Sequence, residues 1–499
     1  MNITSQLTKN LFVKKCFVSG CQFFLIGLFL SCSNSVSRYD ENKREPQITP
    51  DYSGVTIPPN IAPLNFTINE KADKFQVKIY PLNDDTLVIT SNSKNISIPA
   101  GKWKELLNQR KGKEFFIEVL ARQEDHWIKF LPVVNHVAID SIDSYLVYRL
   151  IDPVFKLWNN MGIYQRCLEN FDETPIMINE MGKGNCMNCH SFSGNDSHTM
   201  MFHMRGKIAG TIFYRNGKIS KVNTKTSQTI SAGVYPAWHP NKRYLAFSVN
   251  NIIQQFHAVP DKKVEVIDTL SDLILYDCEK NMISNCPEIA SKERFETFPT
   301  WSPDGRYLYF CSARAIPITR YNQIKYDLLR ITFDPETRQF GKTDTVVSST
   351  KMGLSVSFPR ISPDGKYVLF CMSAYGNFTI WHSDSDLYLM NLETNEIVKP
   401  DINSSLTESY HTWSSSGRWI VFSSRRIDGL FTRPFFAYFD STGKTRKPFV
   451  LPQKNPGFYE TFLKSYNVPE LVTSKVDLDP RDVSKIIKSE LINASFESK

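Results

Sequence analysis

The sequence predicts a mainly β protein, in which an N-terminal β-sandwich-like domain is followed by a β-propeller. Aromatic residues make up 13% of the 499 residues, and glycine and proline are scattered along the chain. This composition suits many short strands joined by turns. One phrase, a turn followed by an alternating strand, also recurs beyond residue 230. Since 41% of the residues are hydrophobic and 22% are charged, the chain has the balance of a folded soluble protein.

Residues 1–31 have the layout of a secretory signal peptide. Lys14 and Lys15 precede an apolar run, an order that is typical of export signals. The tripeptide that ends at Cys32 resembles a bacterial lipoprotein signal, which implies lipidation of Cys32. An uncleaved anchor helix is the alternative. Either way, we expect residues 32–58 to form a tether. The protein is expected to be a membrane-anchored component of the bacterial cell envelope, facing the periplasm or the cell surface.

Residues 59–144 are predicted to form the β-sandwich-like domain. Three segments in this range alternate apolar and polar residues: FQVKIY (75–80), TLVITS (86–91) and EFFIEVLA (114–121). Period-two spacing with polar turns in between predicts strands.

The next segment, from Tyr145 to Asn170, is rich in aromatic residues and leucine and is interrupted by Pro153. This pattern predicts a short helix or a packing segment.

The repeated phrase predicts a β-propeller over residues 230–499, which include a C-terminal extension. The four copies are YPAWHPNKRYLAFS from Tyr235, FPTWSPDGRYLYFC from Phe298, FPRISPDGKYVLFC from Phe358 and YHTWSSSGRWIVFS from Tyr410. Their spacing of about 50 to 60 residues is that of propeller blades with variable loops. Gly305 and Gly365 supply the permissive dihedral that the turns need. One blade alone cannot bury both of its faces, so several must stack.

The phrase closely resembles the repeat of TolB-like (WD40-like) and dipeptidyl-peptidase-like propellers. The resemblance covers residues 230 to 450 and implies five or six blades. The whole chain resembles propeller lipoproteins of Bacteroides-like bacteria that carry a single C-x-x-C-H motif. Within this arrangement, residues 145–229 are expected to hold that motif and the start of the propeller.

The motif itself is Cys186-Met187-Asn188-Cys189-His190, a string that predicts covalent attachment of one haem c. Two thiols bind the haem vinyl groups, and the adjacent imidazole reaches the iron as the proximal ligand. Export agrees with this prediction, because bacterial haem c is attached outside the cytoplasm. The alternatives are a Cys186–Cys189 disulfide, a thioredoxin-like redox pair and half of a zinc site. The chain has no second C-x-x-C for a zinc site.

Candidates for the sixth iron ligand follow the motif closely. They are His198, Met200, Met201, His203 and Met204. His203 is slightly favoured over Met204, because it lies in what looks like a strand that would hold it rigidly. Histidine would give a lower potential than methionine.

The remaining cysteines favour structural roles. Cys311 and Cys371 occupy the position that Ser248 and Ser423 occupy in the other copies of the phrase, which indicates a slot for a small side chain. Cys278 and Cys286 are predicted either to form a hairpin disulfide or to remain buried thiols.

The sequence therefore favours an exported cytochrome-like protein for electron transfer or redox sensing, whose propeller docks a redox partner or envelope protein. The alternative is a non-redox envelope lipoprotein that binds protein or glycan. The net charge of +8 comes without a dense basic run, so no nucleic-acid partner is expected. The chain lacks the G-x-S-x-G, phosphate-loop and H-E-x-x-H motifs, which disfavours an enzyme of those classes.

Overall fold

The computed structural model describes residues 36–81, 86–152, 160–259 and 262–498. The chain divides into two units, residues 1–39 and residues 40–499. Cys32, the expected lipidation site, lies outside the described residues. In the described part of the chain, no helix is long and apolar enough to cross a membrane.

The second unit begins with a domain of two sheets. The larger sheet contains β1 (Asp40–Glu41), β3 (Thr56–Ile57), β5 (Lys74–Tyr80), β6 (Leu87–Ser91), β8 (Glu114–Gln123), β9 (His126–Lys129) and β10 (Val133–Val137). The smaller contains β2 (Ile48–Thr49), β4 (Phe66–Ile68) and β7 (Asn95–Ile96). Buried Val77 and Val119 pair across β5 and β8, and they share one apolar core with Phe66 and Ile96 of the smaller sheet. The β-sandwich-like prediction is therefore confirmed.

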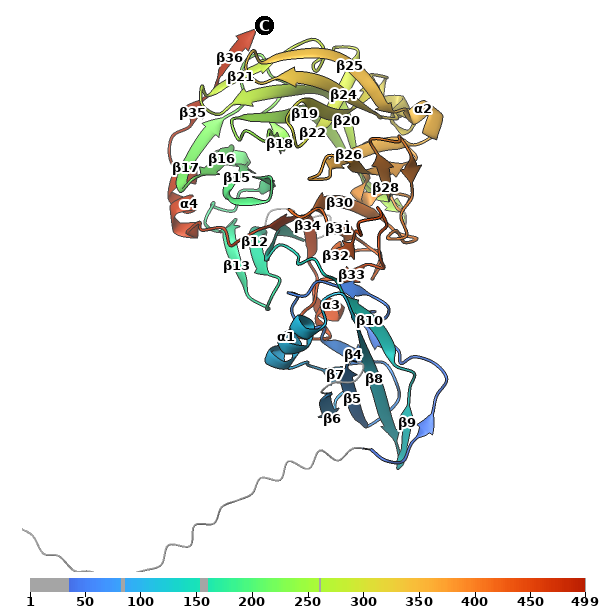
Figure 1. The fold of residues 1–499 in the computed structure, drawn as a ribbon. Coiled ribbons are helices and arrows are strands. Elements are labelled where there is room, and N and C mark those ends of the chain that lie inside the picture. The colour runs from blue at the N-terminus through green and yellow to red at the C-terminus, as the bar shows by residue number, and fades with distance from the viewer. Residues whose placement is uncertain (1–35, 82–85, 153–159, 260–261, 499) are drawn as a thin grey trace, which may run out of the picture. The chain divides into compact units, whose positions relative to one another are not determined.

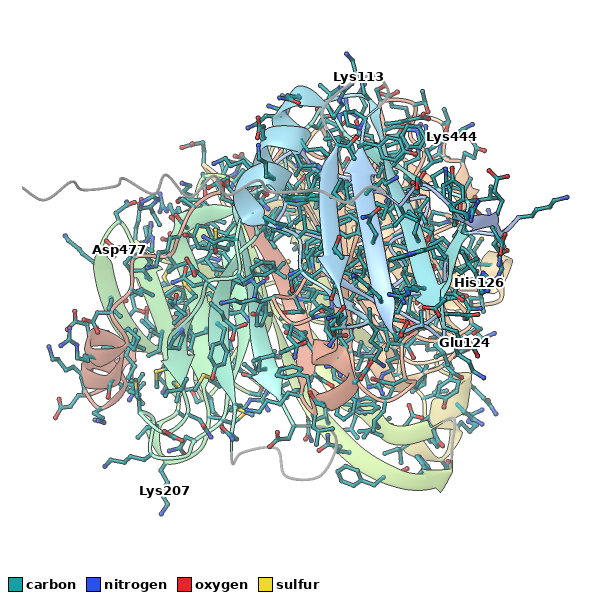
Figure 2. The ribbon with its side chains drawn as sticks, turned by 90° about the horizontal axis from the view of Figure 1, so that it is seen from below. Lys113, Glu124, His126, Lys207, Lys444 and Asp477 are labelled. Carbon is teal, nitrogen blue, oxygen red and sulfur yellow. The ribbon has the colours of Figure 1, made fainter. Side chains whose placement is uncertain are left out.

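Two features of this domain were not predicted. Residues 40–58, expected to be a tether, contribute β1 to β3 and fully bury Tyr52 and Val55, because these apolar side chains gain stability by leaving water. A helix, α1 (Ala100–Gln109), also covers the core with Trp103 and Leu107. Charged residues stay outside, and Figure 2 shows Glu124 and His126 pointing outward at the β8–β9 turn.

Residues 145–472 form six antiparallel four-stranded sheets, named blades 1 to 6. Blade 1 contains β34 (Ser465–Val472), β11 (Tyr145–Ile151), β12 (Gly162–Cys167) and β13 (Glu173–Ile178). Blade 2 contains β14 (Met187–Ser193), β15 (Asp196–Met204), β16 (Gly210–Arg215) and β17 (Lys218–Asn223). Blade 3 contains β18 (Val234–Trp238), β19 (Tyr244–Val259), β20 (Lys262–Asp277) and β21 (Met282–Asn285).

The other three blades have the same order. Blade 4 contains β22 (Arg294–Trp301), β23 (Tyr307–Arg314), β24 (Asp327–Asp334) and β25 (Gln339–Val347). Blade 5 contains β26 (Ser355–Ile361), β27 (Tyr367–Ser373), β28 (Asp386–Asn391) and β29 (Ile397–Val398), and blade 6 contains β30 (Glu408–Trp413), β31 (Trp419–Ser424), β32 (Arg433–Tyr438) and β33 (Phe449–Val450). The innermost strand of each blade contacts that of the next, and β34 contacts β14. The sheets thus close into a ring (Figure 1), a propeller with six blades.

Blade 1 closes the ring with strands from both ends of the propeller. Its innermost strand, β34, pairs with β11, which lies more than 300 residues earlier in the chain and is followed by β12. The described residues of the segment 145–170 therefore form strands and pack inside a blade, where a short helix or a packing segment was predicted, and residues 153–159 lie outside the described residues. The consecutive residues Leu146, Val147 and Tyr148 are all buried, because a blade is covered by neighbours on both faces.

Tryptophans of the repeated phrase join neighbouring blades. The indole Nε1 of Trp238, Trp301 and Trp413 donates to the carbonyl oxygen of Ser191, Ala237 and Arg360 in the preceding blade, at 3.3, 3.1 and 3.1 Å. Blade 5 has Ile361 at the corresponding position of its strand and so has no indole to donate.

After blade 1, the C-terminal tail returns along the outer edges of two blades. Helix α4 (Pro480–Ile487) is capped by the Asp479 carboxylate, β35 (Ile492–Asn493) pairs with β17, and β36 (Ser495–Ser498) pairs with β21. The tail thereby covers edges that would otherwise expose unpaired backbone groups. The remaining short helices are η1 (Gly206–Ile208), η2 (Ile318–Gln323), α2 (Ser349–Met352), η3 (Thr379–Trp381) and α3 (Phe458–Thr461).

Candidate functional site

A backbone bulge recurs in the innermost strand of every blade. In each case the first bulged residue has a left-handed φ, between 46° and 54°: Val468, Cys189, Tyr235, Phe298, Phe358 and Tyr410 in blades 1 to 6. The strand pairing skips this residue and the next, as between Asn188 and Ser191 in blade 2. A bulge redirects its side chains away from the ordinary alternation. The dipeptide Cys189-His190 therefore occupies the position that an aromatic residue and proline occupy in blades 3 to 5, and that Tyr410-His411 occupies in blade 6.

All six first bulged residues line one cavity of about 260 Å³. This volume is just below the range of about 300–1,000 Å³ that is common for small-molecule sites. Its aromatic wall follows the ring of blades: adjacent ring centroids of Tyr235, Phe298, Phe358 and Tyr410 are 4.4, 4.0 and 4.9 Å apart. The cavity thus lies at the centre of the propeller, where the blades meet.

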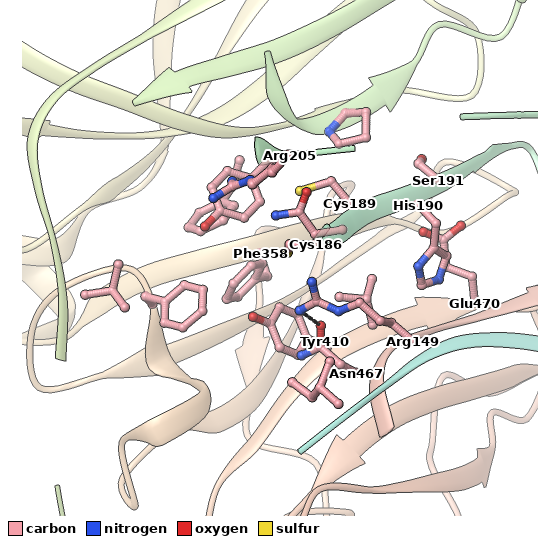
Figure 3. Close-up of a pocket in the computed structure, with 18 of the residues that line it drawn as sticks. Arg149, Cys186, Cys189, His190, Ser191, Arg205, Phe358, Tyr410, Asn467 and Glu470 are labelled. Carbon is pink, nitrogen blue, oxygen red and sulfur yellow. Dashed lines mark hydrogen bonds between the residues drawn. The ribbon is translucent and has the colours of Figure 1, made fainter. Parts of the chain in front are cut away.

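Both cysteines of the C-x-x-C-H motif line this cavity (Figure 3). Cys186 is buried and Cys189 is partly exposed, and both are free thiols. Burial raises the pKa of the Cys186 thiol, whereas the charges of Arg149 and Arg205 act in the opposite direction. Cys278 and Cys286 are free thiols as well, so the structure does not contain the hairpin disulfide.

His190 also lines the cavity and is 2% exposed. Its ring lies close enough to the backbone of Val147 and Val468 in blade 1 for polar interactions that raise its pKa, but neither ring nitrogen reaches full hydrogen-bond geometry with a described residue. Burial lowers the pKa of His190 to about 3, so the ring is neutral at physiological pH. A buried imidazole without a hydrogen bond is costly, and it leaves a nitrogen available to a ligand.

The predicted distal ligands lie in different places. His203 packs against Phe247 of blade 3, with ring centroids 5.9 Å apart, so it faces the side of blade 2 opposite to His190. Its Nδ1 lies 2.8 Å from the Thr211 hydroxyl, its buried Nε2 has no hydrogen-bond partner among the described residues, and burial lowers its pKa to about 3. Met204 belongs to the apolar cluster that contains Cys186. The structure therefore does not bring His203 to His190.

In each blade, one residue of the second strand pairs with the residue that precedes the bulge in the innermost strand. In blades 3 to 6 this position holds Ser248, Cys311, Cys371 and Ser423. The register therefore confirms that the repeats share one position for a small side chain. In blades 1 and 2 the same position holds Arg149 and His203. The departures from the repeat are thus concentrated in the two blades around the C-x-x-C-H motif.

The cavity also contains charged residues that the sequence analysis did not predict as part of the site. Its lining contains Arg149, Arg205, Arg360 and Glu470, which come from blades 1, 2 and 5. No spacing in the sequence links them, because only the closed ring brings them together. In the described part of the chain, no group of three His, Cys, Asp or Glu residues is arranged to hold a metal ion by itself.

Comparison with known proteins gave no matching family model and no matching curated protein. Several solved structures are similar. A chain of the nidogen/laminin complex shares 6% identity over 61% of this chain and 92% of its own, with a TM-score of 0.37. A DUF4784 family protein from Bacteroides caccae shares 10% identity over 72% of this chain and 96% of its own (TM-score 0.30). The Cps50 (Swd1) β-propeller domain of Myceliophteria thermophila shares 9% identity over 52% and 69% (TM-score 0.30). Because these TM-scores are low, the propeller fold is assigned from the six sheets of this structure and not from the comparisons.

Proposed function

We propose that this chain is an exported, membrane-anchored β-propeller that carries one haem c for electron transfer or redox sensing. Cys186 and Cys189 would hold the haem covalently, His190 would supply an axial nitrogen, and Cys32 would carry the lipid. The observation that supports this most strongly is that two free thiols and an imidazole with no hydrogen bond line the same cavity.

The residues of the cavity fit such a group in three respects. The thiols are free, as thioether formation requires. The aromatic wall of Tyr235, Phe298, Phe358 and Tyr410 offers an apolar surface to a flat macrocycle. His190 carries an unpaired ring nitrogen. When bound, the haem iron would supply one-electron chemistry, and the protein would set its position and surroundings.

The cysteine and histidine side chains of the C-x-x-C-H motif do not point in the same direction. Because the dipeptide forms a bulge in β14, the Cys189 sulfur and the His190 ring leave the strand in different directions, and the ring lies beside Glu470 in Figure 3. In this proposal, Cys186 and Cys189 would be the attachment points on the cavity wall, and the imidazole would be held between blades 1 and 2.

The test is to express the mature chain together with a haem c maturation system. After denaturing extraction of free haem, we expect the pyridine haemochrome spectrum to show covalent haem. Cys186→Ala and Cys189→Ala should each abolish the double thioether attachment, whereas Cys278→Ala, which removes a thiol outside the cavity, should leave the spectrum unchanged. His190→Ala should keep the haem and change its visible spectrum. A folded but colourless wild-type protein would contradict the proposal and leave the non-redox scaffold that binds protein or glycan.

A further inference from the structure

The charges that line the central cavity do not balance. The lining contains three arginines, Arg149, Arg205 and Arg360, but one carboxylate, Glu470. Arg360 and Glu470 also line a second cavity of about 450 Å³, and the charge of Arg360 acts on Glu470. These two residues therefore interact electrostatically at the boundary between the cavities, although burial raises the pKa of Glu470 to about 7. Arg149 and Arg205 have no such partner in the described part of the chain.

Arg149 is held rigidly by neutral acceptors. Its Nη1 donates to the Met187 carbonyl oxygen at 3.0 Å, and its Nη2 donates to Asn467 Oδ1 at 2.7 Å. These bonds attach the guanidinium to β14 and β34, the innermost strands of blades 2 and 1. Nε is buried without a hydrogen-bond partner among the described residues. Since a guanidinium has five N–H donors, Arg149 has donors to spare.

Arg205 lies at the exposed mouth of the same cavity. With the Asn188 amide oriented so that its oxygen faces the guanidinium, this oxygen accepts from Nε and Nη2 at 3.0 and 3.1 Å. Asn188 is again a neutral acceptor. Both arginines act on the Cys186 thiol, and in the view of Figure 3 the two cysteines lie between them. The two positive charges therefore flank one part of the cavity.

Arg149 is partly buried in a largely apolar wall, where a cation is favourable only when an anion accompanies it, whereas Arg205 is exposed and adds a second positive charge at the mouth. The planar fork of arginine matches a carboxylate, with which it forms paired hydrogen bonds. We propose that Arg149 and Arg205 form a carboxylate-binding site in the central cavity. The carboxylate has two sources with the same chemistry: a propionate of the attached haem, or a free small carboxylate. The site rests on the arginines alone and does not require the haem.

Isothermal titration calorimetry with succinate tests this site, with the neutral succinamide as the matched control ligand. The protein is the full mature chain, in a haem-loaded form and as the haem-free Cys186→Ala/Cys189→Ala variant. We expect the haem-free form to bind succinate and not succinamide. Arg205→Gln should weaken binding about ten-fold or more, because a hydrogen bond to a charged group is lost. Arg149→Lys, which keeps the charge and loses the fork, should weaken it less. Arg306→Gln, on an exposed turn of blade 4, should have no effect.

The haem-loaded form separates the two sources. If it no longer binds succinate, a propionate occupies the site; if it still does, the site serves a free carboxylate. The proposal is overturned if the haem-free protein does not bind succinate. It is also overturned if Arg205→Gln and Arg149→Lys bind succinate as tightly as the haem-free protein that keeps both arginines. A colourless wild-type protein would refute the proposed haem attachment, but the binding of succinate by the two arginines could still be measured.

Discussion

Blades 2 and 4 share one backbone geometry but differ in the side chains that this geometry presents. The bulge in blade 4 starts at Phe298, with φ 50°, and that in blade 2 starts at Cys189, with φ 54°. In both, the strand pairing skips two residues. Blade 4 presents an aromatic ring to the central cavity, whereas blade 2 presents a thiol. The difference teaches that the repeat supplies the position, and that substitution within one repeat supplies the chemistry.

If equivalent positions in the blades have the same structural role, the same substitution in two blades should change stability by different amounts only where the residues that contact the side chain differ. The largest change in stability is expected at the position two residues before the bulge. Glu408 of blade 6 is buried and pairs with Arg426 at 2.9 Å. Glu408→Gln leaves this arginine without its partner and should lower the free energy of unfolding by about 3 kcal/mol. Urea denaturation measures the loss, and a decrease below about 1 kcal/mol would contradict the account.

Glu296 is the equivalent residue of blade 4, and it provides the pH prediction. Burial, together with the nearby charge of Asp272, raises the pKa of Glu296 to about 8, and the charge of Arg294, which pairs with Asp327 at 3.7 Å, opposes this only in part. The folded state therefore binds an extra proton above the ordinary pKa of 4.5. As the pH rises from about 5 to about 8, this proton is lost and stability falls. Glu296→Gln should flatten the pH dependence of the unfolding free energy; curves that run parallel to wild type would show that Glu296 does not titrate in this range.

The turn glycines of blades 4 and 5 make the next comparison. Gly305 and Gly365 have φ values of 72° and 73°, so alanine at either position costs about 1–2 kcal/mol of backbone strain. A Cβ at position 305 would also lie 2.5 Å from His239 Nε2, whereas at position 365 the nearest atom, in Pro303, is 3.8 Å away. His239 is buried and its Nε2 lies 3.0 Å from the Gly305 carbonyl oxygen, which hinders its movement. Gly305→Ala should therefore have the lower melting temperature, and equal values would refute the clash.

The smallest effect is expected for the indole that joins blades 3 and 4. Trp301→Phe removes the hydrogen bond from Nε1 to the Ala237 carbonyl oxygen, which should cost about 1 kcal/mol in addition to the packing lost with part of the buried ring. Ile361→Val in blade 5, where this bond does not exist, serves as the control for packing loss alone. Thermal unfolding of the two variants should separate the two contributions, and equal losses would argue against the bond.

The sequence predicted the propeller because four blades keep the same phrase with its turn. The composition of blade 1 was not predicted, since its strands β34 and β11 come from opposite ends of the propeller and form no continuous repeat. This is also why the aromatic segment from Tyr145 was predicted as a short helix or a packing segment and not as the strand β11. Blade 2 was expected only as the start of the propeller, because Cys189-His190 replaces the aromatic-proline pair of blades 3 to 5, and the equivalence of the two pairs became visible only through the strand register.

The C-x-x-C-H motif could be read directly, but its surroundings could not. Arg149 and His203 occupy the position that holds serine or cysteine in the other blades, so an alignment of all six blades would have marked them as unusual. Arg205 lies after the end of β15, outside the phrase. That it lines the same cavity as Arg149 depends on ring closure, which pattern reasoning within one segment cannot supply.

The most direct test converts blade 2 into an ordinary repeat with the variant Cys186→Ala/Cys189→Phe/His190→Pro. Its circular dichroism and its pyridine haemochrome spectrum are compared with those of wild type after expression with a haem c maturation system. The account predicts covalent haem in wild type and a folded, haem-free variant. Covalent haem retained in the variant, or absent from folded wild type, would contradict the assignment of this bulge as the haem attachment site.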